Sequence, residues 1–346
     1  MNSRERVLKA VNHSETDRVP FDMFGTYSPG KNRIMKFLKV STDEEMFCIL
    51  GIDFWDVGPF WYRGEKKLHR GKPLDEWGIP IENYSSCDSS GYYPLSEVSS
   101  IDDVENYKWP VIDNFYTDHI KKEIENHDEY ALVGGSGAPI FHYGGWLCGL
   151  ENMLVNMIEQ PEVAEAIIRK ITDFWVEYTK KVLEIGKGRI DIIENRNDFG
   201  AQDRMFISPE LFRRFYKPAL KRIYDTAKEY GALILQHSCG SIAPIIPDYI
   251  EIGVDILNPI QVTARGMDPL LLKNRYGDKL TFHGGIDTQY ILPNGTTEEV
   301  RSNVREMINV MGKGGGYVLS GTQGFETDDI PVENIYAMYD EGKKVK

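Results

Sequence analysis

The feature that most constrains the fold is a repeated alternation between short apolar runs and segments with helical periodicity. The apolar runs have the length of buried strands, and most are followed by a segment long enough for a helix. The strand candidates are residues 19–23, 51–57, 130–137, 190–195, 232–235, 254–257, 279–287 and 316–320. Strands that alternate with helices pair in parallel, so these eight units predict an α/β fold of the (β/α)8, or TIM-barrel, type.

The helical segments carry their own start and stop signals. Residues 150–182 predict two helices split near Gln160 and Pro161, because a proline inside a helix interrupts its hydrogen bonds. Ser208, Pro209 and Glu210 predict the start of another helix, with serine as its N-cap and proline in its first turn. An amphipathic N-terminal helix over residues 3–12 predicts an extension ahead of the barrel. The remaining helices are expected over residues 31–47, 113–126, 268–276, 297–311 and 332–343.

Residues 63–109 differ from the rest of the chain. They are rich in glycine, serine, tyrosine and charged residues, and they lack an apolar core of their own. We predict a surface insertion that passes over the barrel mouth as a lid or an interaction surface. The whole chain, residues 1–346, is therefore predicted to be a single domain with this insertion.

Charge and cysteine content narrow the function classes. The formal net charge of −13 argues against a nucleic-acid partner, which normally meets a basic surface. The four cysteines are far apart and form no CxxC pair, as is typical of the reducing cytoplasm. No apolar run reaches membrane-spanning length, and the charged N-terminal residues do not resemble a signal peptide. We therefore expect a cytoplasmic protein without a membrane partner.

A His-Ser-Cys motif follows the strand candidate at residues 232–235. It places His237 and Cys239 one residue apart in a tight turn that ends at Gly240. Zinc accepts imidazole nitrogen together with thiolate sulfur, so this pair can chelate one metal ion. Two protein ligands do not complete a zinc site, however, and the alternative is a hydrogen-bonded histidine beside a small buried cysteine.

Polar side chains follow every late strand candidate. Because barrels of this type carry their active sites at the carboxyl ends of the strands, we expect Glu194, His237, Cys239, Asn258 and His283 to open onto one cavity. The alternative is that several of them are solvated loop residues. The polar residues at the five late strand ends are Glu194 and Asp198, His237 and Cys239, Asn258 and Gln261, His283 and Asp287, and Thr322 and Gln323.

Five segments of the later half of the chain form a distinctive series: ISPELFRRFYKPALKRIYD, LILQHSCGSIAPIIPDYIEIGVDILNPIQ, FHGGIDTQYILPNGT, GGGYVLSGTQGF and DDIPVENIYAMYD. In sequence and in order, these segments resemble the uroporphyrinogen decarboxylase superfamily. The likeness is densest over residues 207–339 and fainter in the N-terminal segment RERVLKAVNHSETDRVPF. The resemblance implies a (β/α)8 barrel, which agrees with the strand count.

The superfamily contains two main chemistries. Decarboxylases that act on uroporphyrinogen carry an arginine-rich segment resembling RQAGRY after the first strand, whereas this chain reads PFDMFGTYSPGKNR and lacks that arginine pair. A substrate with many carboxylates needs paired cations. The other branch transfers methyl groups with a corrinoid protein, and its members carry a His-x-Cys motif like that of His237 and Cys239. Their zinc site is completed by a cysteine near the last strand, where this chain has Thr322.

The leading prediction is a corrinoid-dependent methyltransferase that moves a methyl group between a small methylated substrate and a corrinoid protein. Zn²⁺ would be held by His237, Cys239 and an oxygen ligand, for which we choose Glu194 over Asp198 and Glu326. We expect the corrinoid on a partner protein, because the chain has no D-x-H-x-x-G motif. The methyl donors left open are methyl ethers, methylamines and methylated aromatics.

Residue roles follow from the same resemblance and from position at the strand ends. Asp198 or His283 would supply a proton, and Asn258 completes the catalytic set. The predicted substrate-binding residues are Gln202, Gln261, Asp287 and Gln323. The alternatives are a decarboxylase acting on a porphyrinogen or another acid, and a non-catalytic protein that binds a tetrapyrrole or corrinoid. A homodimer is left open.

Overall fold

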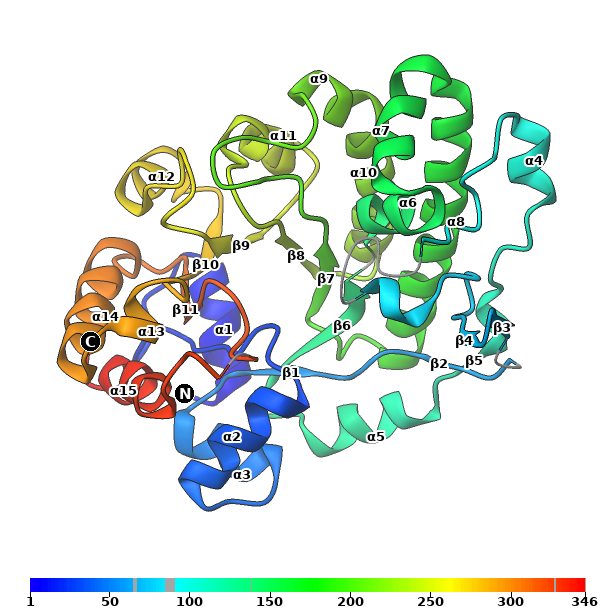
Figure 1. Ribbon diagram of the computed structural model, residues 1–346. Coiled ribbons are helices and arrows are strands. Elements are labelled where there is room, and N and C mark those ends of the chain that lie inside the picture. Colours follow the sequence, from blue (N-terminus) through cyan, green and yellow to red (C-terminus); the bar gives the residue numbers. More distant parts are fainter. Residues whose placement is uncertain (65–66, 85–90, 138, 327, 346) are drawn as a thin grey trace.

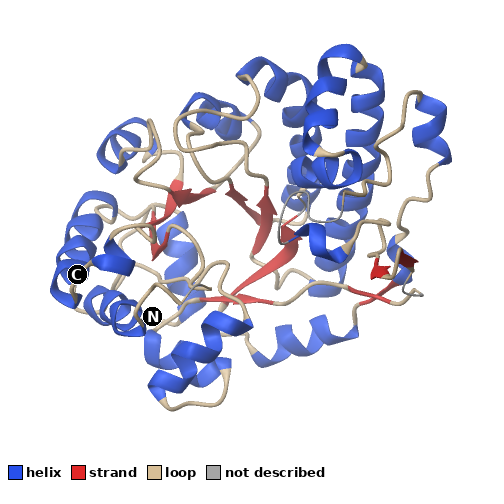
Figure 2. Ribbon diagram, viewed as in Figure 1, coloured by secondary structure: helices blue, strands red, loops and turns tan. Residues whose placement is uncertain are grey.

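One curled parallel sheet organises the molecule in the computed structural model, which describes residues 1–64, 67–84, 91–137, 139–326 and 328–345 (Figures 1 and 2). Its seven strands lie in the order β1-β6-β7-β8-β9-β10-β11, and every neighbouring pair is parallel. This confirms an α/β fold and seven of the predicted strands. The strands are β1 (Phe54–Asp56), β6 (Ala131–Gly137), β7 (Ile192–Arg196), β8 (Leu233–His237), β9 (Ile256–Ile260), β10 (Thr281–Ile286) and β11 (Tyr317–Gly321).

The segment predicted as the first strand, residues 19–23, pairs through a single parallel bridge between Phe21 and Leu319 of β11. On its other side, the carbonyl of Phe21 accepts a 2.8 Å hydrogen bond from the amide of Asp53, which precedes β1. The segment thus lies between the two edge strands. It does not form a longer ladder because Pro20 has no amide to donate and the Asp22 side chain turns back to accept from the amide of Met23.

Helices surround the outer face of the sheet (Figure 2). None in the described part of the chain is long and apolar enough to cross a lipid bilayer. The principal helices are α1 (Ser3–Val11), α2 (Ser28–Leu38), α3 (Asp43–Leu50), α5 (Asp118–Asn126), α6 (Ile140–Cys148), α7 (Leu150–Glu159), α8 (Pro161–Gly186), α10 (Lys217–Glu229), α11 (Ile246–Glu251), α12 (Pro269–Tyr276), α13 (Ile291–Asn294), α14 (Thr297–Met311) and α15 (Val332–Gly342).

Helix α1 closes the amino-terminal end of the sheet. Its Val7 and Val11 join a buried cluster with strand residues that point inward, among them Phe54, Leu235 and Val318. Its backbone also accepts from the residue before β11, since the amide of Gly316 donates to the carbonyl of Ala10 at 2.8 Å. The opposite, carboxyl end of the sheet is left for the polar loops.

One helix prediction is corrected by the structure and another is confirmed. Residues 31–47 were predicted as one helix, but the chain forms α2 and α3, because Lys39 adopts a left-handed conformation that ends α2 and Thr42 caps the start of α3. The predicted break at Gln160 is confirmed between α7 and α8. Before α10, a short helix α9 (Pro209–Leu211) passes through a π-helical turn at Phe212–Tyr216.

The predicted insertion contains only short elements. Strand β3 (Leu68–His69) pairs with β4 (Lys72–Pro73) inside it, and β2 (Trp61–Tyr62) pairs with β5 (Phe115–Tyr116) on its two sides. The 3₁₀-helical turn η1 (Ile81–Tyr84) and helix α4 (Ile101–Asn106) follow. Trp77 fixes this region to the barrel, because its buried ring packs against Tyr143 and Phe174 on helices α6 and α8. Residues 65–66 and 85–90, including Cys87, lie outside the described residues.

Candidate metal centre and its cleft

Three potential metal ligands converge at the carboxyl ends of β7 and β8. Asp198 follows β7, His237 ends β8, and Cys239 lies two residues further on. Their ligand atoms all lie within 4.8 Å of one another. His237 Nε2 lies 3.3 Å from Asp198 Oδ1 and 3.4 Å from Cys239 Sγ. The three donors are therefore close enough to share one ion.

The Asp198 loop is held against the Cys239 loop by a backbone contact that only glycine permits. Gly240 has a φ of +81°, and a Cβ on it would lie 2.4 Å from the carbonyl carbon of Gly200. Beside this contact, the amide of Cys239 donates to Asp198 Oδ1 at 2.8 Å. The two glycines thus bring the carboxylate to the His-Cys pair.

A chain of buried polar groups continues from His237 into the barrel. Its Nδ1 lies 2.5 Å from Asn258 Oδ1, and Asn258 Nδ2 lies 2.6 Å from His283 Nδ1. His283 Nε2 lies 2.8 Å from Asp22 Oδ2. Phe24 covers this chain, with its ring stacked on His237 at 5.0 Å between centroids. The predicted residues Asn258 and His283 are therefore linked to the centre through His237.

The charged groups of the centre stabilise one another in their ionised forms. Burial favours a lower pKa for His237, but Cys239 and the Asp198 carboxylate outweigh it and raise this pKa well above its usual range. Burial likewise opposes ionisation of Asp198, yet His237 and His142 hold the pKa of that carboxyl well below its usual range. The centre therefore keeps a carboxylate ready to accept a cation.

Glu194, our choice for the oxygen ligand, is not part of this group. Its buried carboxylate is bound by Arg196, which also donates to the hydroxyl of Tyr27. Glu194 and Arg196 are two residues apart on β7 and lie on the same side of the strand, whereas Asp198 lies beyond its end. The structure thus brings together Asp198, the alternative, with His237 and Cys239. The other alternative, Glu326, accepts from the amide of Tyr27.

Glu194 instead lines a small cavity of about 160 Å³ together with Phe24. The cavity also contains Asp56, at the end of β1, and Arg196. Loss of hydration and then the nearby Glu194 carboxylate raise the pKa of Asp56 to about 6. Asp56 was not among the predicted site residues, although it ends a predicted strand as the others do.

The predicted substrate-binding residues have separate surroundings. Gln261 accepts from the amide of Gly240 at 2.7 Å and donates to Gln202 at 2.9 Å, so both support the Cys239 loop. Asp287 caps the loop that leads into α13, accepting from the amides of Gln289 and Tyr290. Gln323 is exposed. Thr322, where the resemblance places a third ligand, shares a 2.8 Å hydrogen bond with Thr288.

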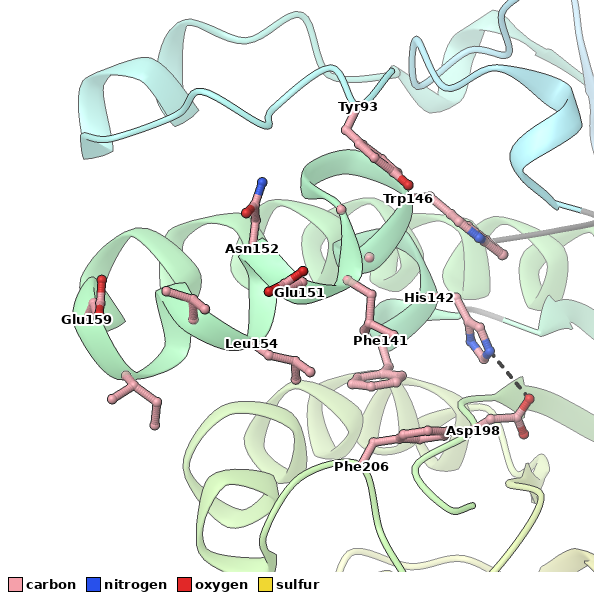
Figure 3. Close-up of a pocket in the computed structure, with 15 residues that line it drawn as sticks. Tyr93, Phe141, His142, Trp146, Glu151, Asn152, Leu154, Glu159, Asp198 and Phe206 are labelled. Atoms are coloured by element: carbon pink, nitrogen blue, oxygen red, sulfur yellow. Dashed lines mark ion pairs between the residues drawn. The ribbon is translucent and has the colours of Figure 1, made fainter. Parts of the chain in front are cut away.

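A cleft of about 1010 Å³ leads from the metal centre to the surface along α6 and α7 (Figure 3). Asp198 and His142 line its inner end, with His142 Nε2 3.4 Å from Asp198 Oδ2. Its walls are mainly apolar and aromatic, including Phe141, Trp146 and Phe206. No lysine or arginine lines it among the described residues. His142 was missed by sequence reasoning, because a single histidine at the start of a helix carries no spacing signal.

The family model described as uroporphyrinogen decarboxylase (URO-D) matches residues 93–345. The chain belongs to this family. The match begins inside the predicted insertion and includes the metal centre and the cleft, and it confirms the resemblance inferred from the sequence.

Some relatives of this chain are named methyltransferases and others uroporphyrinogen decarboxylases. A methylated-thiol–coenzyme M methyltransferase of Methanosarcina mazei is 28% identical over 197 residues, which cover 57% of this chain and 49% of the relative. A uroporphyrinogen decarboxylase of Oceanobacillus iheyensis is 23% identical over 192 residues, covering 54% and 53%. The chain thus spans about half the length of these curated relatives. A solved methyltransferase from Methanosarcina mazei has a TM-score of 0.71 at 16% identity and 99% coverage of both chains, which supports the fold.

Proposed function

We propose that the protein is a methyltransferase that moves a methyl group between a small methylated substrate and a corrinoid protein. One observation carries the proposal: Asp198, which lines a cleft that opens to the surface, lies together with His237 and Cys239. The likeness to a methylated-thiol–coenzyme M methyltransferase also supports a place in the methyl-transferring branch of the superfamily. The seven-stranded sheet is consistent with a single (β/α)8 domain if the bridge at Phe21 occupies the eighth strand position.

The residues of the centre fit a Zn²⁺ ion. Imidazole nitrogen, thiolate sulfur and carboxylate oxygen are all zinc ligands, and a site with three protein ligands keeps one position open for a substrate. We propose His237, Cys239 and Asp198 as the ligands. A bound zinc ion supplies Lewis-acid polarisation of the heteroatom that carries the methyl group.

The cleft favours an uncharged methylated substrate. Its described lining offers three carboxylates, Glu151, Glu159 and Asp198, and no lysine or arginine. A porphyrinogen with many carboxylates would find no paired cations there. An apolar body such as the ring of a methoxylated aromatic compound would instead pack against Phe141, Trp146 and Phe206. The exposed apolar side chains of Val155 and Ile158 on the cleft wall suit the approach of the corrinoid carrier.

The chain's own residues position the substrate and handle the proton. His142 reaches the cleft beside Asp198 and is the group we assign to protonate the departing heteroatom. His283, the earlier choice for this role, is fully buried and bonded at both ring nitrogens, so it does not reach the cleft. Asp198 takes the role of metal ligand.

The test combines metal analysis with a methyl-transfer assay. Purified protein should contain about one zinc per chain, and Cys239→Ala and Asp198→Ala should lose it, whereas Glu194→Gln should keep it. With reduced corrinoid and a panel of methyl ethers, methylamines and methyl thiols, an uncharged donor should yield methylcorrinoid, followed by its absorption spectrum. Absence of methylcorrinoid with every donor, together with carbon dioxide release from uroporphyrinogen, would establish a decarboxylase instead.

A further inference from the structure

We propose that Asp22, His283 and Asn258 form a relay that fixes the protonation pattern of His237 and so presents its Nε2 lone pair to the metal position. The three are positioning residues, since they act through His237 and none is a ligand. The proposal extends the metal site of the proposed function, but its first steps concern hydrogen bonds that exist without any metal.

The relay begins at the Asp22 carboxylate, which can only accept hydrogen bonds. Its Oδ1 accepts from the amide of Met23 at 2.7 Å, which fixes the direction of the carboxylate. Its Oδ2 lies 2.8 Å from His283 Nε2, so that nitrogen must carry the proton and donate. His283 is fully buried, and the rings of Phe24 and Phe54 pack edge-on against it.

The second step passes through Asn258. A neutral imidazole with its proton on Nε2 has an accepting Nδ1, and Asn258 Nδ2 donates to that nitrogen at 2.6 Å. The amide group of Asn258 is thereby oriented, with its oxygen directed to the other side. That oxygen lies 2.5 Å from His237 Nδ1, which must therefore be the donor.

The last step reaches the metal centre. With one proton held on Nδ1, His237 gives up the other from Nε2 when a metal ion binds, and the Nε2 lone pair then faces Asp198 Oδ1 and Cys239 Sγ. This is the nitrogen that a metal held by the other two ligands requires. The hydrogen bond on the far nitrogen of a ligating histidine commonly selects its tautomer and orientation.

The reversed amide orientation conflicts with Asp22. If Asn258 turned its NH₂ group toward His237, its oxygen would demand a proton on His283 Nδ1. A neutral His283 would then point its Nε2 lone pair at the carboxylate of Asp22, two acceptors 2.8 Å apart. With a neutral His283, the buried carboxylate of Asp22 therefore determines the orientation of His283, of Asn258 and, through them, of the Nδ1 proton of His237.

The experiment reads the ring nitrogens directly. In protein labelled with ¹⁵N-histidine, long-range ¹H–¹⁵N correlation spectra should show His283 protonated on Nε2 and His237 protonated on Nδ1, with and without zinc. A proton on Nδ1 of His283, with or without one on Nε2, would overturn the relay. The expected pattern in a protein that binds no zinc would support the relay and reject the proposed metal function, so the two failures are distinguishable.

Variants test the effect on metal binding, measured by competition with a chelating indicator. Asn258→Leu breaks both links and should weaken zinc binding by about 10–100-fold, the usual effect of losing a partner of a ligating histidine. The isosteric Asn258→Asp still accepts from His237 and should retain zinc, while His283 gains a second proton on Nδ1. Thr172→Val, which alters a buried hydroxyl on α8 outside the relay and the metal centre, is the matched control and should leave affinity unchanged. Unchanged affinity in a folded Asn258→Leu protein would refute the positioning role.

Discussion

The substitution Asp53→Asn tests how the N-terminal segment is held to the barrel. Asp53 is fully buried, and its carboxylate accepts from Arg6 at 2.6 Å, from Arg18 at 2.7 Å and from the amide of Phe21 at 2.8 Å. Asparagine keeps the shape of the side chain but removes its charge. The two guanidinium groups then lose a buried partner, although Arg6 keeps its ion pair with Asp17.

The magnitude follows from that geometry. Breaking a buried ion pair costs about 3–5 kcal/mol of stability. Because Arg6 keeps its pair with Asp17, we expect a loss of about 3 kcal/mol, at the lower end of this range. An unfolding entropy of about 2.1 cal/mol/K per residue gives ~0.7 kcal/mol/K for a chain of 346 residues. The melting temperature should therefore fall by about 4 °C.

Differential scanning calorimetry at pH 7 measures this change. Asp203→Asn is the matched control, because Asp203 is exposed and pairs with its neighbour Arg204, and its melting temperature should equal that of the wild type. The segment held by Asp53 also carries Asp22, so zinc affinity should fall with stability. A fall of less than about 1 °C would refute the assigned cost of breaking the pair.

Three further predictions concern the site. The pKa of Asp56 is raised to about 6, so the folded state holds this proton more tightly than the unfolded state does, and the resulting stability is lost as pH rises from about 4 through 6. The melting temperature of Asp56→Asn should therefore exceed that of the wild type at pH 8 but not at pH 4. Equal differences in melting temperature at the two pH values would contradict this. Gly240→Ala should weaken zinc binding by separating the Cys239 and Asp198 loops. Unaltered zinc affinity in a chelator competition would contradict this. Ile158→Asp, on the exposed cleft wall, should slow methyl transfer with the corrinoid protein and leave zinc content unchanged; an unchanged rate would exclude this wall as the contact.

The strands were predictable because each is a short apolar run between polar loops. Seven of these runs became β1 and β6 to β11 close to the predicted bounds. The run around Phe21 has the same composition, but its pairing depends on whether backbone amides are free to donate. Pro20 removes one donor and Asp22 redirects the chain, which reduces that strand to a single bridge. Apolar periodicity does not contain this information.

The candidate site was predictable only in part. His237 and Cys239 stand out because ligand-type residues one position apart follow a strand. The carboxylate ligand does not stand out, since Glu194 within β7 and Asp198 just after it are both acidic residues near the same strand end. The contact between the Gly200 and Gly240 loops brings Asp198 to the centre, and that contact joins loops 40 residues apart in the chain. Long-range contacts of this kind are set by tertiary structure and leave no local pattern.

The composition of the candidate metal centre also determines how it would respond to oxidants. Two neighbouring thiolates can close into a disulfide and expel their ion, but among the described cysteines Cys239 is the only one in the cluster. The reversible oxidation products of this sulfur are therefore a sulfenic acid and a mixed disulfide with a small thiol. Both products are reduced by ordinary cellular thiols, so the damaged centre is repaired without rearranging a second cysteine.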